Sequence, residues 1–173
     1  MGLLGLLGCG DEDEPAVDAA SEADAPMAPR EPLSIRPGEG IGPVNVGDRW
    51  SDIVGVLDGA RPVAFNRLGL VAVPRMGMEV VLASSMDSMV SDDAYVMGIG
   101  ALDGGTFEGP IEPGATEAEL LESLGEADFE AGGVRFYTEG LSVELGEDGT
   151  VSKVAVIAPF TIDETAPRME MAL

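Results

Sequence analysis

The sequence contains an internal repeat, and this similarity limits the available folds more than any other feature. Gly42-Pro43-Val44-x-x-Gly47 matches Gly109-Pro110-Ile111-x-x-Gly114, 67 residues later. Further along, Gly77-Met78-x-Val80-x-Leu82 matches Gly140-Leu141-x-Val143-x-Leu145, 63 residues later. Solenoid proteins use shorter and more numerous repeats than these. The pattern therefore predicts one domain built from two tandem copies of a small module.

Each copy is expected to open with a short helix. Asp48 and Thr116 are favourable N-cap residues. Apolar residues follow both on helical spacing: Trp50, Ile53, Val54 and Leu57 in the first copy, and Leu120, Leu121 and Leu124 in the second. Thr116 and Glu119 fit a capping box, and Gly59 and Gly125 occupy typical C-cap positions. We therefore expect two helices of about ten residues.

Alternating apolar runs follow each helix and indicate half-buried strands. They cover residues 62–66, 70–74, 78–82 and 95–102 in the first copy, and residues 134–138, 141–145 and 151–157 in the second. Asp148-Gly149 is typical of an antiparallel hairpin turn. The predicted fold class is α+β, with a helix and a three- or four-stranded antiparallel meander in each copy. We expect the sheets to join edge to edge with both helices on one face, which leaves the other face open to a partner.

The N-terminus carries the strongest indication of cellular location. Cys9 is the only cysteine, and it ends the apolar run MGLLGLLGCG. This run resembles the lipobox of bacterial lipoproteins, which implies cleavage before Cys9 and lipid on its sulfur and α-amine. Residues 1–8 contain no Lys or Arg, whereas a complete signal peptide begins with a positive segment. We interpret residues 1–8 as a truncated lipoprotein signal peptide; the alternative is a frayed apolar terminus with an incidental cysteine.

The resemblance also implies an address in the cell envelope. Gly10 stands where an aspartate favours retention in the inner membrane, so the expected location is the outer membrane, facing the periplasm or the cell surface. Residues 9–32 are expected to form the lipidated cysteine and a disordered acidic tether, because Asp, Glu, Ala, Pro and Ser dominate them. Residues 33–162 then form the tandem-repeat domain, and residues 163–173 a flexible C-terminal tail.

Composition argues against several classes of function. Acidic residues outnumber basic ones by 32 to 9, so the surface should repel nucleic acid and anionic lipid. The chain has no histidine, which removes the usual general base and the commonest imidazole metal ligand. With Cys9 lipidated, no thiol remains for catalysis. We therefore expect no catalytic residue, no cofactor and no metal, although composition leaves a carboxylate pair open.

The repeated motifs also carry a family resemblance. A Gly-Pro-Ile/Val-x-x-Gly turn, a short helix ending near Leu-Gly and a Gly-Leu-x-Val-x-Leu strand are similar to the modules of small outer-membrane-assembly lipoproteins and tandem β-lactamase-inhibitor proteins. Residues 107–157 match more closely than the first copy. The chain departs from the former in having two modules, and from the latter in its lipobox and its lack of cysteine pairs. The resemblance implies a non-enzymatic scaffold that works through its sheet face, and it transfers no functional residue.

Three residues are candidates for contact with a partner. Trp50 is the only tryptophan, and it either packs at the start of the first helix or anchors an interface. Met86 and Met89 lie in the longest interruption between strands, where methionines fill gaps in a core, bind copper(I) or form an adaptable contact surface. The sequence thus predicts a lipid-anchored, non-catalytic protein-binding module of the assembly-accessory or inhibitor type. The alternatives are a purely structural surface lipoprotein and a carboxylate-based envelope hydrolase.

Overall fold

A computed structural model describes residues 31–57, 60–65, 68–83, 90–162 and 169–171 of the chain. All of them belong to one compact unit, Glu31–Leu173. This unit is mostly sheet with few helices, which agrees with the predicted α+β class. Within these ranges, no helix has the length and apolar character needed to span a membrane.

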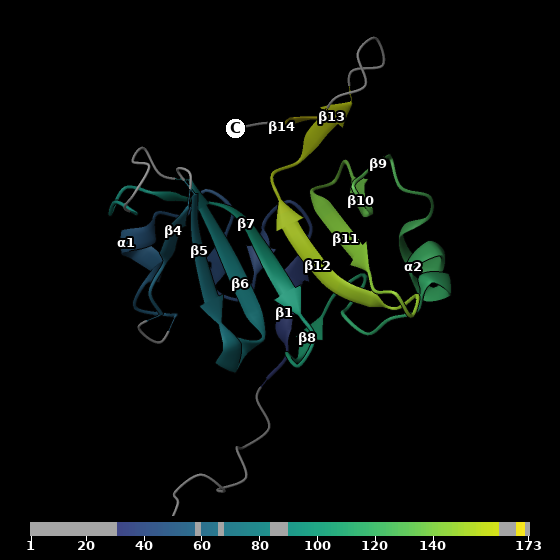
Figure 1. Cartoon of the computed structure of the whole chain (residues 1–173), viewed down its shortest axis with the longest axis horizontal. Coiled ribbons are helices and arrows are strands. Elements are labelled where there is room, and N and C mark those ends of the chain that lie inside the picture. Colours follow the sequence, from purple (N-terminus) through teal and green to yellow (C-terminus); the bar gives the residue numbers. More distant parts are fainter. Residues whose placement is uncertain (1–30, 58–59, 66–67, 84–89, 163–168, 172–173) are drawn as a thin grey trace, which may run out of the picture. The chain divides into compact units, whose positions relative to one another are not determined.

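The main element is an eight-stranded sheet made of two consecutive antiparallel meanders (Figure 1). The first meander consists of β4 (Val63–Phe65), β5 (Leu68–Val73), β6 (Met78–Ala83) and β7 (Tyr95–Leu102). The second consists of β9 (Phe129–Ala131), β10 (Val134–Tyr137), β11 (Leu141–Leu145) and β12 (Val151–Ile157). Strand β7 pairs antiparallel with β12, so the expected edge-to-edge joining is confirmed.

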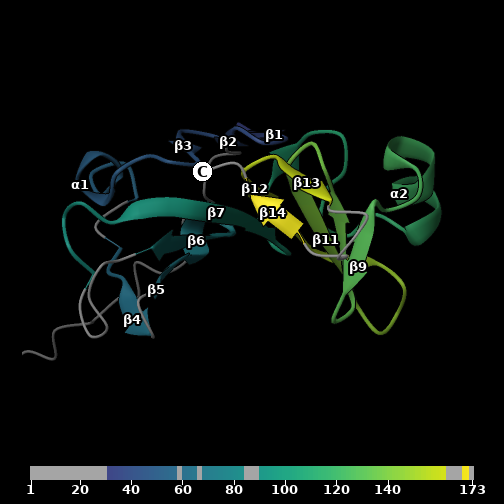
Figure 2. The ribbon, with the colours of Figure 1, turned by 90° about the horizontal axis from the view of Figure 1, so that it is seen from above.

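A smaller sheet, which the alternating pattern did not predict, lies on one side of the large sheet (Figure 2). It has the order β3-β2-β1-β8 and consists of β1 (Leu33–Arg36), β2 (Gly40–Ile41), β3 (Val44–Asn45) and β8 (Phe107–Glu108). Both helices lie on that same side, as expected, while β4 and β9 bend away from it. The large sheet therefore has one covered face and one uncovered face.

The hydrophobic core lies between the two sheets. The small sheet contributes Ile35, Ile41 and Val44, which are all buried. The large sheet contributes alternate residues from β5, β6, β7, β11 and β12, among them Val71, Val80, Ile99, Val143 and Val154. Because side chains alternate between the faces of a strand, the residues between these positions point to the uncovered face.

The first helix is much shorter than predicted. Helix α1 spans only Trp50–Ile53, and its N-cap is Arg49, which makes no side-chain cap hydrogen bond. Asp48 does not cap it, because its carboxylate accepts hydrogen bonds from the backbone N–H of Asn45 at 2.7 Å and from the Asn45 amide. In addition, Gly55 costs about 1 kcal/mol relative to alanine inside a helix. The prediction of two helix-plus-meander modules is thus corrected: one of the two described α-helices is a single turn.

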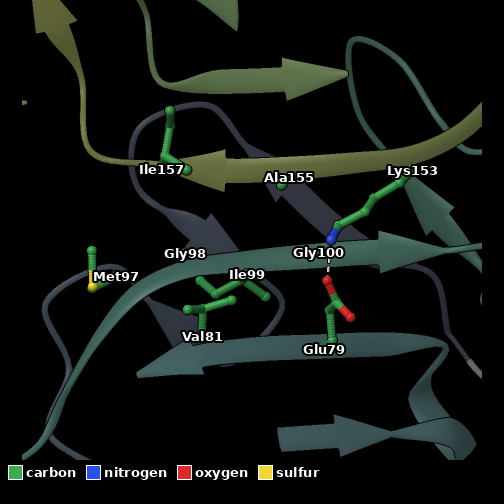
Figure 3. A pocket seen from close by; sticks show the side chains of 9 residues that line it. All are labelled: Glu79, Val81, Met97, Gly98, Ile99, Gly100, Lys153, Ala155 and Ile157. Atoms are coloured by element: carbon green, nitrogen blue, oxygen red, sulfur yellow. Dashed lines mark hydrogen bonds and ion pairs between the residues drawn. The ribbon is translucent and has the colours of Figure 1, made fainter. Parts of the chain in front are cut away.

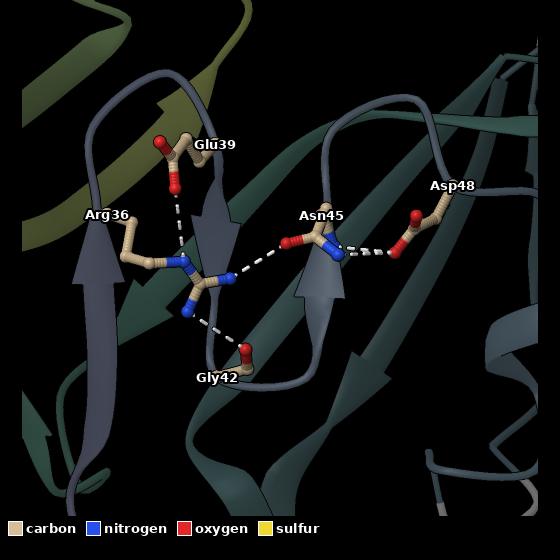
Figure 4. Close-up of polar contacts among 5 residues, drawn as sticks. All are labelled: Arg36, Glu39, Gly42, Asn45 and Asp48. Carbon is tan, nitrogen blue, oxygen red and sulfur yellow. Dashed lines mark hydrogen bonds and ion pairs between the residues drawn. The ribbon is translucent and has the colours of Figure 1, made fainter.

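Asp48 belongs instead to a polar network that holds the first Gly-Pro-Val turn (Figure 4). The Arg36 guanidinium donates to the Gly42 carbonyl at 3.1 Å and to Asn45 Oδ1 at 2.8 Å. It also forms an ion pair with Glu39 at 3.5 Å. The network lies on the side of the small sheet, so we assign it to the turn rather than to a binding site.

The second helix agrees with its prediction. Helix α2 spans Glu117–Leu124, and the capping box is confirmed: Thr116 Oγ1 accepts from the Glu119 N–H at 3.3 Å, and Glu119 Oε2 accepts from the Thr116 N–H at 2.8 Å. Gly125 ends the helix with a φ of 76°. Leu120 is the buried residue of the helix, whereas the neighbouring Leu121 is exposed.

The capping box predicts a dependence of stability on pH. The backbone N–H and then the hydroxyl of Thr116 lower the pKa of Glu119 below its ordinary 4.5. A lowered pKa gives stability that is fully present above 4.5 and is lost as the pH falls through the folded value. Glu119→Gln keeps the capping acceptor but does not titrate. We therefore expect the wild type to lose stability relative to Glu119→Gln as the pH falls from about 5 to about 3. Urea unfolding of both proteins at several pH values measures this difference. Parallel curves for the two proteins would contradict this.

The end of the chain contains a further strand pair. Strand β13 (Phe160–Ile162) pairs antiparallel with β14 (Met169–Met171). The segment predicted as a flexible tail, residues 163–173, therefore includes a paired strand at residues 169–171. The alternation of Met169-Glu170-Met171 was too short to be recognised as a strand from the sequence.

Candidate functional site: an apolar open face of the large sheet

The uncovered face of the large sheet, here called the open face, is mainly apolar. Residues that pair across antiparallel strands point to the same side, so the registers define its rows. One row is Val63, Leu70, Val81, Gly98 and Ile157. A second is Ala72, Glu79, Gly100, Ala155, Ser142, Phe136 and Phe129. The third row is Leu102, Lys153, Glu144, Val134 and Ala131. Beyond the first row lies a short fourth row of Leu68, Ala83 and Tyr95.

Large apolar side chains on this face contact solvent. Val63 is 70% exposed and Leu70 45%, and Leu68 and Tyr95 are exposed as well. Outward positions of a half-buried antiparallel sheet are usually polar. The apolar character of both faces of β5 and β6 is instead typical of strands covered on both sides, yet nothing within the described part of the chain covers these residues.

Two glycines create a hollow at the centre of the open face (Figure 3). Gly98 and Gly100 lie on β7, the strand that joins the two meanders, and they place no side chains on the surface. The hollow has a volume of about 180 Å³. Its walls near Gly98 are apolar and come from Val81, Met97 and Ile157. The hollow thus lies over β7, at the junction of the two meanders.

An ion pair closes the other end of the hollow. The Lys153 ammonium on β12 donates to the Glu79 carboxylate on β6, and the pair crosses β7 above Gly100 (Figure 3). A Cβ atom at Gly100 would lie 2.9 Å from both Glu79 Cγ and Lys153 Cε. Glycine at this position therefore makes room for the ion pair, which links the two meanders side chain to side chain.

A second hollow of about 240 Å³ adjoins the first and shares Lys153 and Ala155 with it. Its remaining walls are Val134, Phe136, Ser142 and Glu144. Beside it, the Phe136 ring contacts the rings of Phe129 and Phe160, with centroids 5.9 Å and 6.4 Å away. Both hollows are smaller than the roughly 300–1,000 Å³ of ordinary small-molecule sites. The arrangement suits flat contact with a protein better than enclosure of a substrate.

The chemistry of these two hollows is limited. Each is lined by one carboxylate, Glu79 in the first and Glu144 in the second, and both hollows include Lys153. Across the described ranges, no group of three or more His, Cys, Asp or Glu side chains is placed to hold a metal ion.

The sequence-predicted site residues lie away from the open face or outside the described residues. Trp50 is 7% exposed and belongs to the core, which supports its packing alternative over the role of interface anchor. Cys9, Met86 and Met89 fall outside the described residues. Sequence reasoning missed Leu70, Gly98 and Lys153. The apolar character of both alternating sets in residues 68–73 is a sequence signal for Leu70, whereas Gly98 and Lys153 join it only through the strand register.

Searches for related proteins add no family assignment. The chain matches no protein-family model, and no curated protein or solved structure resembles it significantly.

Proposed function

We propose that this protein is a lipid-anchored protein of the cell envelope that binds another protein, without catalysis, through the open face. The observation that supports the proposal is the exposed apolar surface around Val63, Leu70 and the Gly98–Gly100 hollow. Contiguous exposed apolar surface of this kind marks interaction sites in soluble proteins. An assembly accessory or an inhibitor is the kind of role that such a surface serves.

The charges around the open face favour a protein partner over other classes. The chain carries a net charge of −23, which repels nucleic acids and anionic lipid surfaces. The same charge opposes face-to-face association of two copies of this chain. An apolar face within an acidic protein instead complements a partner that is apolar at the contact and basic around it.

We also infer that the two meanders are copies of one unit, despite the short first helix. Corresponding turns make the same backbone hydrogen bonds. Gly47 and Gly114 have the same φ of 89°, and their N–H groups donate to the carbonyls of Val96 and Val151 at the starts of β7 and β12. Gly77 and Gly140 both have positive φ, and their carbonyls accept from Leu102 and Ile157. The unit paired with itself at β7–β12 provides a surface twice as wide as one copy offers.

The proposed anchor depends on Cys9. We expect Cys9→Ser, expressed behind a complete lipoprotein signal, to move the protein from the membrane fraction to the soluble fraction, because the thiol is the point of lipid attachment. Fractionation and mass spectrometry of the N-terminal peptide measure this. Continued membrane association of the serine variant would reject the lipid anchor without affecting the proposed role of the open face.

The protein-binding role is tested by two matched leucines. Leu70 lies on the open face and is 45% exposed, and Leu121 lies on α2 and is 43% exposed. We expect Leu70→Glu to lower the yield of partner captured from crosslinked envelopes at least tenfold, because a charge at a desolvated contact costs more than about 1.4 kcal/mol. Leu121→Glu should leave the yield unchanged. Equal capture by both variants, or no partner at all, would refute the proposal.

A further inference from the structure

The hollow at Gly98 and the carboxylate of Glu144 together indicate which kind of partner the open face accepts. We propose that it binds a loop or extended segment of a basic protein, with one large apolar side chain in the Gly98 hollow and one Lys or Arg beside Glu144. This inference rests on the proposed protein-binding role and adds the chemistry of the partner.

The apolar part follows from the walls of the first hollow. Val81, Met97 and Ile157 surround Gly98, and the volume of about 180 Å³ is suited to one large side chain. Interface anchors are typically large side chains that enter such pockets and lose their water. A side chain that fills this hollow would pack against β7, where two glycines place no side chains on the open face.

The cationic part follows from the charges on the same face. Lys153 lies between two carboxylates: it pairs with Glu79 across β7, and it stands in register with Glu144 on β11. No ion pair to Glu144 is present among the described residues, and its side chain is exposed on the wall of the second hollow. A partner cation would therefore neutralise Glu144 without breaking an existing bond, in a chain of net charge −23.

The sheet geometry sets the spacing of the two partner residues. From Gly98 the register leads to Ile157 on β12, and from Glu144 it leads to Lys153, four residues earlier on the same strand. Two strand spacings and four residues amount to about 16 Å in a regular sheet. An extended segment covers about 3.3 Å per residue. The cation is thus expected three to five residues from the apolar anchor, and its long side chain spans the remaining distance to Glu144.

A selection experiment tests this without knowledge of the natural partner. The probe is a phage-displayed library of random twelve-residue constrained loops, selected against the full chain. We expect the enriched loops to carry a large apolar residue with Lys or Arg three to five positions away. Their affinity should fall more than tenfold for Gly98→Trp and three- to tenfold for Glu144→Gln, measured by biolayer interferometry. Leu121→Gln is the matched control and should bind like wild type.

Two further results keep the inference falsifiable. A Cβ at Gly98 would lie 3.3 Å from Ile157 Cγ2 and from the Val156 carbonyl, so Gly98→Trp also crowds its neighbours. Ala155→Trp is therefore a second blocking variant, because Ala155 lines both hollows and already carries a Cβ. Loops that bind both blocking variants normally, loops without a Lys or Arg preference, or failure to enrich any loop would each overturn the inference. If envelope capture still depends on Leu70, the proposed protein-binding role survives that failure.

Discussion

Leu120→Ala should lower the free energy of unfolding by about 2–5 kcal/mol, because truncation of a fully buried leucine loses transfer free energy and leaves a cavity. Leu120 is the buried residue of α2 and belongs to the core beneath the second meander. Its exposed fraction is 0%. Without this side chain, the helix retains its capping box but loses its main apolar attachment to the sheet. Urea unfolding followed by circular dichroism measures the change.

The adjacent residue supplies the control. Leu121 is on the same helix and 43% exposed. Leu121→Ala removes the same atoms and changes helix propensity almost equally. Because this side chain is largely exposed, its effect on the free energy of unfolding should stay within about 0.5 kcal/mol. Equal losses from the two variants would show that α2 does not pack against the sheet through Leu120.

Gly140→Ala should be destabilising by roughly 2–5 kcal/mol, because it combines backbone strain with a clash. Gly140 has a φ of 97°, a region that residues with a Cβ avoid. A Cβ here would lie 2.5 Å from Gly38 Cα and 2.5 Å from the Ile157 carbonyl oxygen. Both are backbone atoms, so neither can move aside as a flexible side chain would. Thermal and urea unfolding of the purified variant test the expectation.

Gly114→Ala separates the two contributions. Gly114 has a similar φ of 89°, but nothing lies within 4 Å of an added Cβ. It therefore reports backbone strain alone, about 1–2 kcal/mol. If Gly114→Ala is as destabilising as Gly140→Ala, the close approach between the small sheet's first turn and β11 is not what constrains Gly140.

Most of the large sheet could be predicted from the sequence. The run at residues 95–102 corresponds to β7 in full, and those at 141–145 and 151–157 correspond to β11 and β12. These segments were recognisable because buried and outward residues alternate over at least five positions. The capping box of Thr116 and Glu119 has a fixed local spacing, and it was equally recognisable.

The remaining elements depend on contacts between distant segments. Strands β2, β3 and β8 have two residues each, too few for any period, and β1 pairs in parallel with β8 from far along the chain. Helix α1 failed as a prediction because Asp48 bonds to the preceding turn at Asn45 instead of capping. Such competition between local hydrogen bonds is visible only once the turn is placed.

The candidate site was predicted as a face but not as residues. The expectation that one sheet face stays partly exposed was correct, because both helices and the small sheet lie on the other side of the large sheet. The residues chosen for contact were selected by type, and the side chain of Trp50 proved to be buried in the core. The open face is composed of ordinary residues such as Leu70, Gly98 and Lys153, and only the strand register brings them together.

Site-specific photocrosslinking in intact cells tests the central claim most directly. A photoreactive phenylalanine analogue replaces Val63, which is 70% exposed on the open face, or Val56, which is 50% exposed after α1. We expect a discrete adduct with one envelope protein from position 63 and none from position 56. Adducts from position 56 alone, equal adducts from both positions, or no adduct from position 63 would contradict a binding role for the open face.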